Sequence, residues 1–212
     1  MSGIWTIVVA AGNGTRFGRP KQYEPLRGRR VLDWSLLAAR PASDGIVLVV
    51  PTERAGRPEP AVDVVVAGAD TRSGSVRAGL AAVPDDAEVV LVHDGARPLA
   101  GSDLFAAVAE AIRAPQSGSE PCAGAVPVVP ITDAVRSRTN GVVDRSDLVV
   151  VQTPQAFAAP ALRAAHAGAG EGTDDASLVE AHGGRIELVP GDPVNLKITY
   201  PSDLRVAEAL LP

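Results

Sequence analysis

A loop near the amino terminus, residues 12–21 (GNGTRFGRPK), is the first stretch whose residue types suggest chemistry. It combines three glycines with three cations, namely Arg16, Arg19 and Lys21. Glycines let backbone N–H groups come close to phosphate oxygens, and nearby cations neutralise the charge of a phosphate chain. The loop therefore predicts a polyphosphate site. The alternative, from these residues alone, is an exposed glycine turn with surface arginines.

The spacing of these glycines differs from two well-known phosphate-binding motifs. Gly12, Gly14 and Gly18 are spaced G-x-G-x-x-x-G, whereas the dinucleotide fingerprint is G-x-G-x-x-G. The P-loop pattern G-x-x-x-x-G-K-[ST] is also absent. The loop must therefore be interpreted from its context in the chain.

The lysines are also informative. Of the 20 basic residues only Lys21 and Lys197 are lysines, and the rest are arginines. In a composition that favours arginine, a retained lysine can mark a site that needs a compact ammonium group instead of a planar guanidinium. Both lysines are therefore candidate site residues, with chance as the alternative.

Strand and helix patterns alternate along the chain and must position these residues. Apolar runs of strand length occupy 4–11, 46–50, 62–68, 88–93 and 122–129, and helical patterns occupy 31–40, 72–83 and 102–114, the last with Ser102 as its expected N-cap. Continuous Val/Ile runs are typical of buried parallel strands, and their alternation with helices indicates βαβ units. We expect an α/β fold, a three-layer α/β/α sandwich with a mostly parallel, Rossmann-like sheet.

This alternation is interrupted at residues 131–152. Asn140-Gly141 is a strong hairpin-turn signal between two extended flanks. The segment is expected to project as a β-arm from a single domain spanning 1–212, and a second copy of the chain is expected to support it. The remaining chain predicts helices near 159–167, 173–184 and 202–211 and strands near 185–189 and 194–199.

Composition excludes several functional classes. The 212 residues are 46% hydrophobic and 21% charged, which is ordinary for a globular protein, and the net charge of −5 argues against nonspecific nucleic-acid binding. The single cysteine, Cys122, precludes an intrachain disulfide and is expected to be buried. No apolar run reaches membrane-spanning length, and the start of the chain lacks a secretory signal. We expect a cytoplasmic protein without membrane or nucleic-acid partners.

Six motifs in order resemble those of one enzyme family. They are AAGNGTRFGRPKQY (10–23), GADTRSGSV (68–76), VHDGARP (92–98), VQTPQAF (151–157), TDDASLVE (173–180) and NLKITYPSDL (195–204). The first is similar to the signature loop of nucleotidylyltransferases, and its KQY ending resembles the cytidylyltransferase branch. Together the motifs resemble the 2-C-methyl-D-erythritol 4-phosphate cytidylyltransferase family across residues 4 to 210.

The resemblance implies a reaction and the residues that carry it. A phosphate monoester oxygen attacks the α-phosphorus of CTP, and pyrophosphate leaves. Arg16 and Lys21 match the family pair that stabilises the transition state, while Arg145 and Lys197 match the residues that position the polyol phosphate. Such transfer depends mainly on positioning and on neutralising charge.

The resemblance also implies the nucleotide and metal contacts. The residues that match CTP or substrate contacts are Ala10, Ala11, Gly12, Gly14, Gly68, Ala69, Asp70, Ser75, Gly95, Arg97 and Thr153. Of these, Asp70 and Ser75 are expected at the cytosine, and Arg97 at the polyol phosphate. Asp94, at a strand end, is expected to hold Mg²⁺, with a helix-capping role as the alternative. His93 beside it is expected to be a packing residue.

The family also implies a homodimer in which Arg145 on the β-arm enters the partner's active site. One departure concerns the start of the arm, where the family commonly has Asp-Thr and this chain has Asp133-Ala134. A hydroxyl that contacts the substrate phosphate is therefore absent at its usual position.

Three other functions remain open at this point. A ribitol 5-phosphate cytidylyltransferase would share the loop, the CTP site and the fold. A sugar-phosphate uridylyl- or guanylyltransferase is a more distant alternative. A nucleotide-binding module without catalysis would retain the fold, although the matched residues Arg16, Lys21, Asp94, Arg145 and Lys197 are all present.

Overall fold

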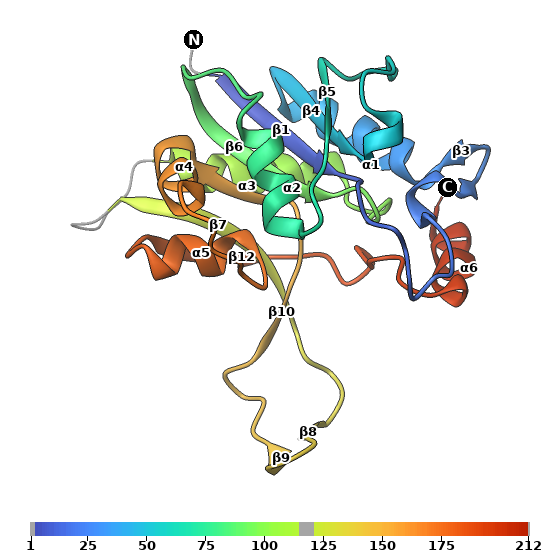
Figure 1. Ribbon diagram of the computed structural model, residues 1–212. Coiled ribbons are helices and arrows are strands. Elements are labelled where there is room, and N and C mark those ends of the chain that lie inside the picture. The colour runs from blue at the N-terminus through green and yellow to red at the C-terminus, as the bar shows by residue number, and fades with distance from the viewer. Residues whose placement is uncertain (1–2, 115–120, 212) are drawn as a thin grey trace.

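The valine- and isoleucine-rich runs form the strands of one central sheet in the computed structural model, which describes residues 3–114 and 121–211 (Figure 1). The strands of this sheet are β1 (Gly3–Val9), β4 (Gly45–Val50), β5 (Val64–Ala67), β6 (Ala87–Asp94), β7 (Cys122–Pro130), β10 (Val149–Val151), β11 (Gln155–Ala158) and β12 (Arg185–Pro190). Two small hairpins are formed by β2 (Pro25–Leu26) with β3 (Arg29–Arg30), and by β8 (Val135–Ser137) with β9 (Gly141–Val143).

The helices mostly follow the predicted segments. They are α1 (Val31–Ala39), α2 (Arg72–Leu80), α3 (Ser102–Arg113), α4 (Ala159–His166), α5 (Asp175–Ala181) and α6 (Pro201–Leu210), with short 3₁₀ turns at Lys21–Tyr23, Arg40–Ala42 and Thr52–Arg54. The expected cap of α3 is wrong, because Gly101 holds the N-cap position and Ser102 is the first helical residue.

The order of the strands places the loop after β1 at a topological switch point of the sheet. The sheet runs β10-β7-β11-β6-β1-β4-β5, with β12 paired to β7. β1 pairs in parallel with β4 on one side and with β6 on the other. The chain thus builds outward from β1 through β4 and β5 and then returns to β6 on the opposite side. In open α/β sheets such a switch point is where ligands bind.

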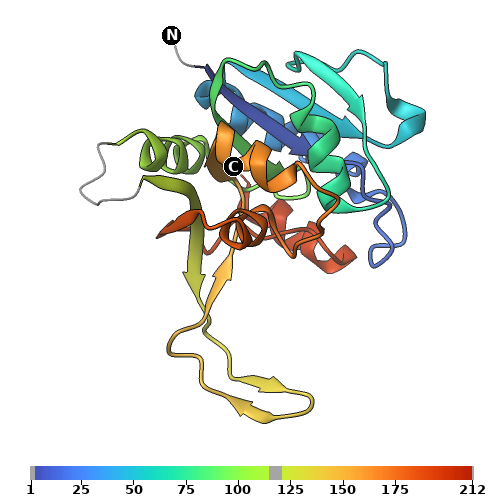
Figure 2. The ribbon, with the colours of Figure 1, turned by 60° about the vertical axis from the view of Figure 1, so that its left-hand side comes forward.

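Helices cover both faces of the sheet, as predicted for a three-layer sandwich (Figures 1 and 2). One core lies under α2, α4 and α5 and includes Val76, Leu162 and Leu178. The other lies under α1 and α3 and includes Leu36 and Phe105. The strands between them are buried on both sides, which is why they appear as continuous apolar runs in the sequence.

Two strand predictions are corrected by the structure. No strand forms at 194–199, which is irregular chain that passes the carboxyl ends of the sheet; its Ile198 N–H donates to the carbonyl of Ala96 at 2.9 Å. Conversely, β11 was not predicted. It pairs antiparallel with both β6 and β7, so the sheet is mostly, not wholly, parallel. Cys122 is buried, as expected.

The β-arm leaves the body of the protein with β10 at its base and the β8–β9 hairpin at its tip (Figures 1 and 2). Its apolar side chains are partly exposed, with Val142 at 76% and Val150 at 46% of their accessible area. Within residues 3–114 and 121–211, no helix is both long and apolar enough to cross a membrane. The expected lack of a secretory signal concerns the start of the chain, of which Met1 and Ser2 lie outside the described residues.

Candidate functional site

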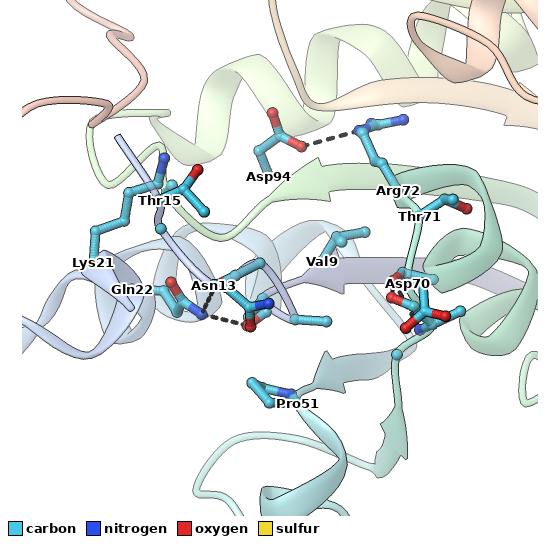
Figure 3. A pocket seen from close by; sticks show the side chains of 18 of the residues that line it. Val9, Asn13, Thr15, Lys21, Gln22, Pro51, Asp70, Thr71, Arg72 and Asp94 are labelled. Carbon is cyan, nitrogen blue, oxygen red and sulfur yellow. Dashed lines mark hydrogen bonds and ion pairs between the residues drawn. The ribbon is translucent and has the colours of Figure 1, made fainter. Parts of the chain in front are cut away.

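Four parallel strands end at one edge of the sheet, and a cavity of about 590 Å³ lies just beyond them. Its walls come from the segments that follow β1, β4, β5 and β6, together with Lys197 from the irregular segment after β12. The volume lies within the usual range for small-molecule sites. Figure 3 shows this pocket with the glycine loop on one side and Asp70–Arg72 on the other.

The pocket contains most of the residues expected from the sequence. Those that line it are Ala10, Ala11, Gly12, Gly14, Arg16, Lys21, Gly68, Ala69, Asp70, Ser75, Asp94 and Lys197. Arg16, Lys21 and Lys197 therefore face one cavity, although Lys197 is far from the other two in the sequence. The positive charges of Lys197 and Arg16 both contribute to lowering the pKa of Lys21.

The glycine loop is held in shape by its own backbone and by one buried amide side chain. Gly14 has φ +64°, and a Cβ there would collide with the carbonyl oxygen of Arg19. The buried Gln22 donates from Nε2 to the carbonyls of Ala10 at 2.6 Å and Gly12 at 2.9 Å (Figure 3). Sequence reasoning missed this role, although Gln22 stands within the quoted KQY motif.

The three cations of the loop do not share one environment. Arg19 is not among the described residues that line the cavity, and it forms two bonds to Glu24, at 2.6 and 2.5 Å. Lys21 is half-buried, and burial together with Lys197 and Arg16 lowers its pKa below the ordinary value. Lys21 is therefore in a field of positive charge that a bound polyanion would relieve.

One end of the pocket is built by the start of α2. Thr71 caps this helix, and its side chain accepts from the Gly74 N–H at 2.9 Å. The Ser75 hydroxyl accepts from the Ala69 N–H at 3.1 Å and donates to the Ala69 carbonyl at 3.2 Å. Ser75 thus shapes the segment 68–70 as well as lining the cavity.

Asp94 is the centre of a group of charges at the end of β6. Its Oδ2 lies 2.6 Å from Lys197 Nζ and 3.9 Å from Arg97 Nε, and its Oδ1 lies 3.4 Å from Arg72 Nε. Burial alone would raise the pKa of Asp94, but Lys197, Arg72 and Arg97 hold it well below its usual range. Asp94 is therefore ionised, and it makes these ion pairs instead of capping a helix.

Three further predicted residues lie behind or beside this carboxylate. Thr153 Oγ1 accepts from the Asp94 N–H at 3.0 Å, and Arg97 Nη1 donates to the Asn195 carbonyl at 2.8 Å. Gly95 is closely packed, because a Cβ there would lie 3.0 Å from Leu32 and 3.3 Å from Ala10. None of the three lines the cavity within the described chain.

His93 is a packing residue in the structure, as expected. It is fully buried against Phe105, with ring centroids 4.8 Å apart, and its Nδ1 lies 3.2 Å from Thr153 Oγ1. Burial lowers its pKa to about 3. A neutral ring therefore supports the Thr153 side of Asp94.

Arg145 is not part of this pocket. It lies on the β-arm, where its Nη1 donates to the carbonyls of Ile131 at 2.8 Å and Asp133 at 2.9 Å. The arm projects from the body on its own (Figure 2). A single chain therefore brings Arg16, Lys21 and Lys197 together and leaves Arg145 apart.

The residues that the structure describes at Asp94 fit Mg²⁺ only as a site with a single protein carboxylate. Among the described residues no group of three or more His, Cys, Asp or Glu side chains is placed to hold a metal. Mg²⁺ commonly uses one or two carboxylates and completes its shell with water and substrate phosphates. An ionised Asp94 at the pocket wall meets that requirement and would be the protein's carboxylate ligand.

Comparison with known proteins agrees with this geometry. Residues 4–212 match the family described as IspD: 2-C-methyl-D-erythritol 4-phosphate cytidylyltransferase. A protein of that name from Rhodococcus jostii (strain RHA1) is 42% identical, over 98% of this chain and 95% of its own length. The crystal structure of the Thermus thermophilus enzyme of the same name is 36% identical, with a TM-score of 0.82 and 96% of both chains covered.

Some relatives are longer. The "Bifunctional enzyme IspD/IspF" of Clavibacter michiganensis subsp. michiganensis (strain NCPPB 382) is 45% identical over 98% of this chain, which spans 54% of that protein. The match covers nearly all of this chain in each case, and the fold agrees with it. The chain belongs to the 2-C-methyl-D-erythritol 4-phosphate cytidylyltransferase family.

Proposed function

We propose that the pocket binds CTP and that the chain transfers its cytidylyl group to 2-C-methyl-D-erythritol 4-phosphate, giving CDP-methylerythritol and pyrophosphate. This is the activity of the family, in non-mevalonate isoprenoid precursor biosynthesis. The observation that carries the residue assignment is that one cavity is lined by Arg16, Lys21 and Lys197 together with Asp94, to which Lys197 is bonded.

The chemistry needs no covalent enzyme intermediate. An oxygen of the substrate phosphate forms a bond to the α-phosphorus of CTP, and the bond from that phosphorus to the bridging oxygen of pyrophosphate breaks. Negative charge develops on the non-bridging oxygens during this exchange. Arg16 and Lys21 both line the cavity, and we assign them the stabilisation of that charge.

The base would occupy the other end of the pocket. Asp70, the backbone of Gly68 and Ala69, and the Ser75 hydroxyl that holds this backbone supply hydrogen-bonding groups there. Glycine at position 68 lets this backbone lie close to Ala11, because a Cβ at that position would collide with the Ala11 side chain. A site of fixed hydrogen-bond partners rejects bases that leave those partners unpaired.

We assign Asp94 as the protein ligand of Mg²⁺. When bound, the metal would neutralise triphosphate oxygens and orient them. Lys197 pairs with Asp94 in the free protein, at 2.6 Å. Its ammonium group is therefore already held at the pocket, where a substrate phosphate can bind to it. Chelation with EDTA is expected to stop pyrophosphate release, and added Mg²⁺ is expected to restore it.

We further propose that the protein acts as a homodimer and that Arg145 serves the partner's pocket. The support is that Arg145 lies on a projecting arm, away from its own cavity, and that Leu148 to Val151 are 39–46% exposed. A second copy would cover these apolar side chains. With Arg97 and Lys197, Arg145 would then position the polyol phosphate.

The direct test is pyrophosphate release from CTP, Mg²⁺ and 2-C-methyl-D-erythritol 4-phosphate by the purified chain. Release with this substrate, exceeding that with ribitol 5-phosphate in a competition of the two, supports the proposal. Preference for ribitol 5-phosphate would reassign the substrate. Folded protein that binds CTP and releases no pyrophosphate would instead support a binding module.

A further inference from the structure

A chain of hydrogen-bonded polar side chains connects the pocket to α5 and α4. Arg72 lines the pocket and bonds to Asp94 Oδ1 through Nε at 3.4 Å. On its other side, Arg72 Nη1 donates to Asp175 Oδ2 at 2.8 Å. The other oxygen of Asp175, Oδ1, lies 3.1 Å from His166 Nε2. Neither Arg72, Asp175 nor His166 is among the residues assigned above.

The burial of this group is unusual for charged side chains. Asp175 is 0% exposed, His166 is 5% exposed, and the Arg72 side chain is 26% exposed. A fully buried carboxylate is costly unless it is paired, and such pairs are poor sources of stability. Here both oxygens of Asp175 are in use, one toward Arg72 and one toward His166. The arrangement fixes geometry at the pocket wall.

These bonds determine the orientation of the Arg72 guanidinium group. Its guanidinium is planar, so bonds from Nε to one carboxylate and from Nη1 to another determine the plane of the group. Its Nη2 has no partner among the described residues, and the residue lies beside Asp94 at the pocket (Figure 3). Burial tends to lower the pKa of Arg72, but Asp94 and Asp175 raise it overall, so it stays charged.

We propose that Asp175, supported by His166, is a positioning residue that holds the Arg72 guanidinium at the pocket wall for the triphosphate of the incoming nucleotide. This inference rests on the proposed function, since it takes CTP to be the ligand. Asp175 does not touch the ligand and acts only through Arg72.

A double-mutant cycle on CTP binding tests this role. We compare Arg72→Ala, Asp175→Asn and the double variant with the parent by calorimetric titration with CTP, without the polyol phosphate. Loss of a charge-assisted bond predicts a dissociation constant roughly tenfold higher in each single variant. The double variant should be no weaker than Arg72→Ala alone. Independent effects that multiply to about a hundredfold would overturn the proposal.

A matched control separates positioning from folding. Asp174→Asn makes the same carboxylate-to-amide change one residue earlier, at the N-cap of α5, where asparagine caps as well as aspartate. It should bind CTP like the parent. In turnover, Asp175→Asn should raise the KM for CTP and leave kcat within about twofold, whereas a structural defect would lower kcat through a smaller active fraction.

The test remains decisive if Asp175→Asn alone does not fold. Arg72→Ala and the double variant then provide the comparison, because the double variant lacks both members of the ion pair and leaves no unpaired buried charge. Equal CTP binding by these two supports the proposal, and weaker binding by the double variant overturns it. A parent that binds CTP but releases no pyrophosphate contradicts the proposed function and leaves this cycle interpretable.

Discussion

Lys197 Nζ lies 2.6 Å from Asp94 Oδ2, although 103 residues separate the two in the chain. The pair joins the end of the buried strand β6 to an irregular segment near the carboxyl terminus. It also places one of the protein's two lysines at the wall of the cavity that contains the other. This relationship leads to the first prediction.

Lys197→Met should impair the use of the polyol phosphate more than that of CTP. The ammonium group is held at the pocket by Asp94, and we assign it to the phosphate of the second substrate. Removing a charged hydrogen-bond donor predicts a loss of kcat/KM for the polyol phosphate of roughly tenfold to a hundredfold. Steady-state kinetics with each substrate varied in turn measures this. An equal loss for both substrates would contradict the assignment.

Lys21→Ala should lower kcat about a hundredfold or more while CTP still binds, because Lys21 is assigned to charge that develops in the transition state. Pyrophosphate release and calorimetric titration with CTP measure the two effects. Arg19→Ala is the matched control in the same loop, since Arg19 is bonded to Glu24 outside the cavity. If binding and turnover fell in parallel, Lys21 would be a binding residue only.

CTP binding should take up protons at alkaline pH. In the free protein, burial, Lys197 and Arg16 lower the pKa of Lys21 below its ordinary value of 10.5. A bound triphosphate favours the charged ammonium and raises that pKa. CTP affinity should therefore fall as the pH rises from the pKa in the free protein to that in the complex. Calorimetry in two buffers of different ionisation enthalpy measures the uptake. Persistence of the same uptake in Lys21→Ala would assign it to another group.

Gly14→Ala should destabilise the protein by about 1–3 kcal/mol and weaken CTP binding, because φ is +64° and a Cβ would collide with the Arg19 carbonyl. The free energy of unfolding from urea titration measures the cost. Gly12→Ala is the stability control, since nothing lies within 4 Å of a Cβ at that position. A loss of stability in Gly12→Ala equal to that in Gly14→Ala would contradict this explanation.

The arm predicts complementation between two inactive variants. In a heterodimer of Lys21→Ala and Arg145→Ala subunits, one pocket has its own Lys21 and receives Arg145 from the other subunit. Refolding the two variants together should thus restore up to about a quarter of the parent activity by random pairing in a symmetric dimer. Light scattering should show a dimer. A fully active monomer, or the absence of any restoration in proven heterodimers, would contradict the trans role of Arg145.

Local patterns predicted the fold because each pattern reflects local burial. Continuous runs such as 46–50 are buried on both faces, so they appeared as parallel strands. The order of the motifs predicted that the loop of Arg16 and Lys21 follows the first strand. The sequence did not reveal β11 or the irregular path of 194–199, because the pairing partners of short segments are chosen by neighbours distant in the chain.

The residue types and motifs of the sequence by themselves determined the layered α/β architecture, the projecting arm and the family. Only the tertiary structure decided which charges meet: Lys197 with Asp94, Arg72 between Asp94 and Asp175, and Arg19 with Glu24 outside the cavity. The physical reason is the distance along the chain over which each effect acts. Periodicity and turn preference act over a few residues, whereas ion pairs and pocket walls depend on which side chains the completed sheet brings within about 4 Å of each other.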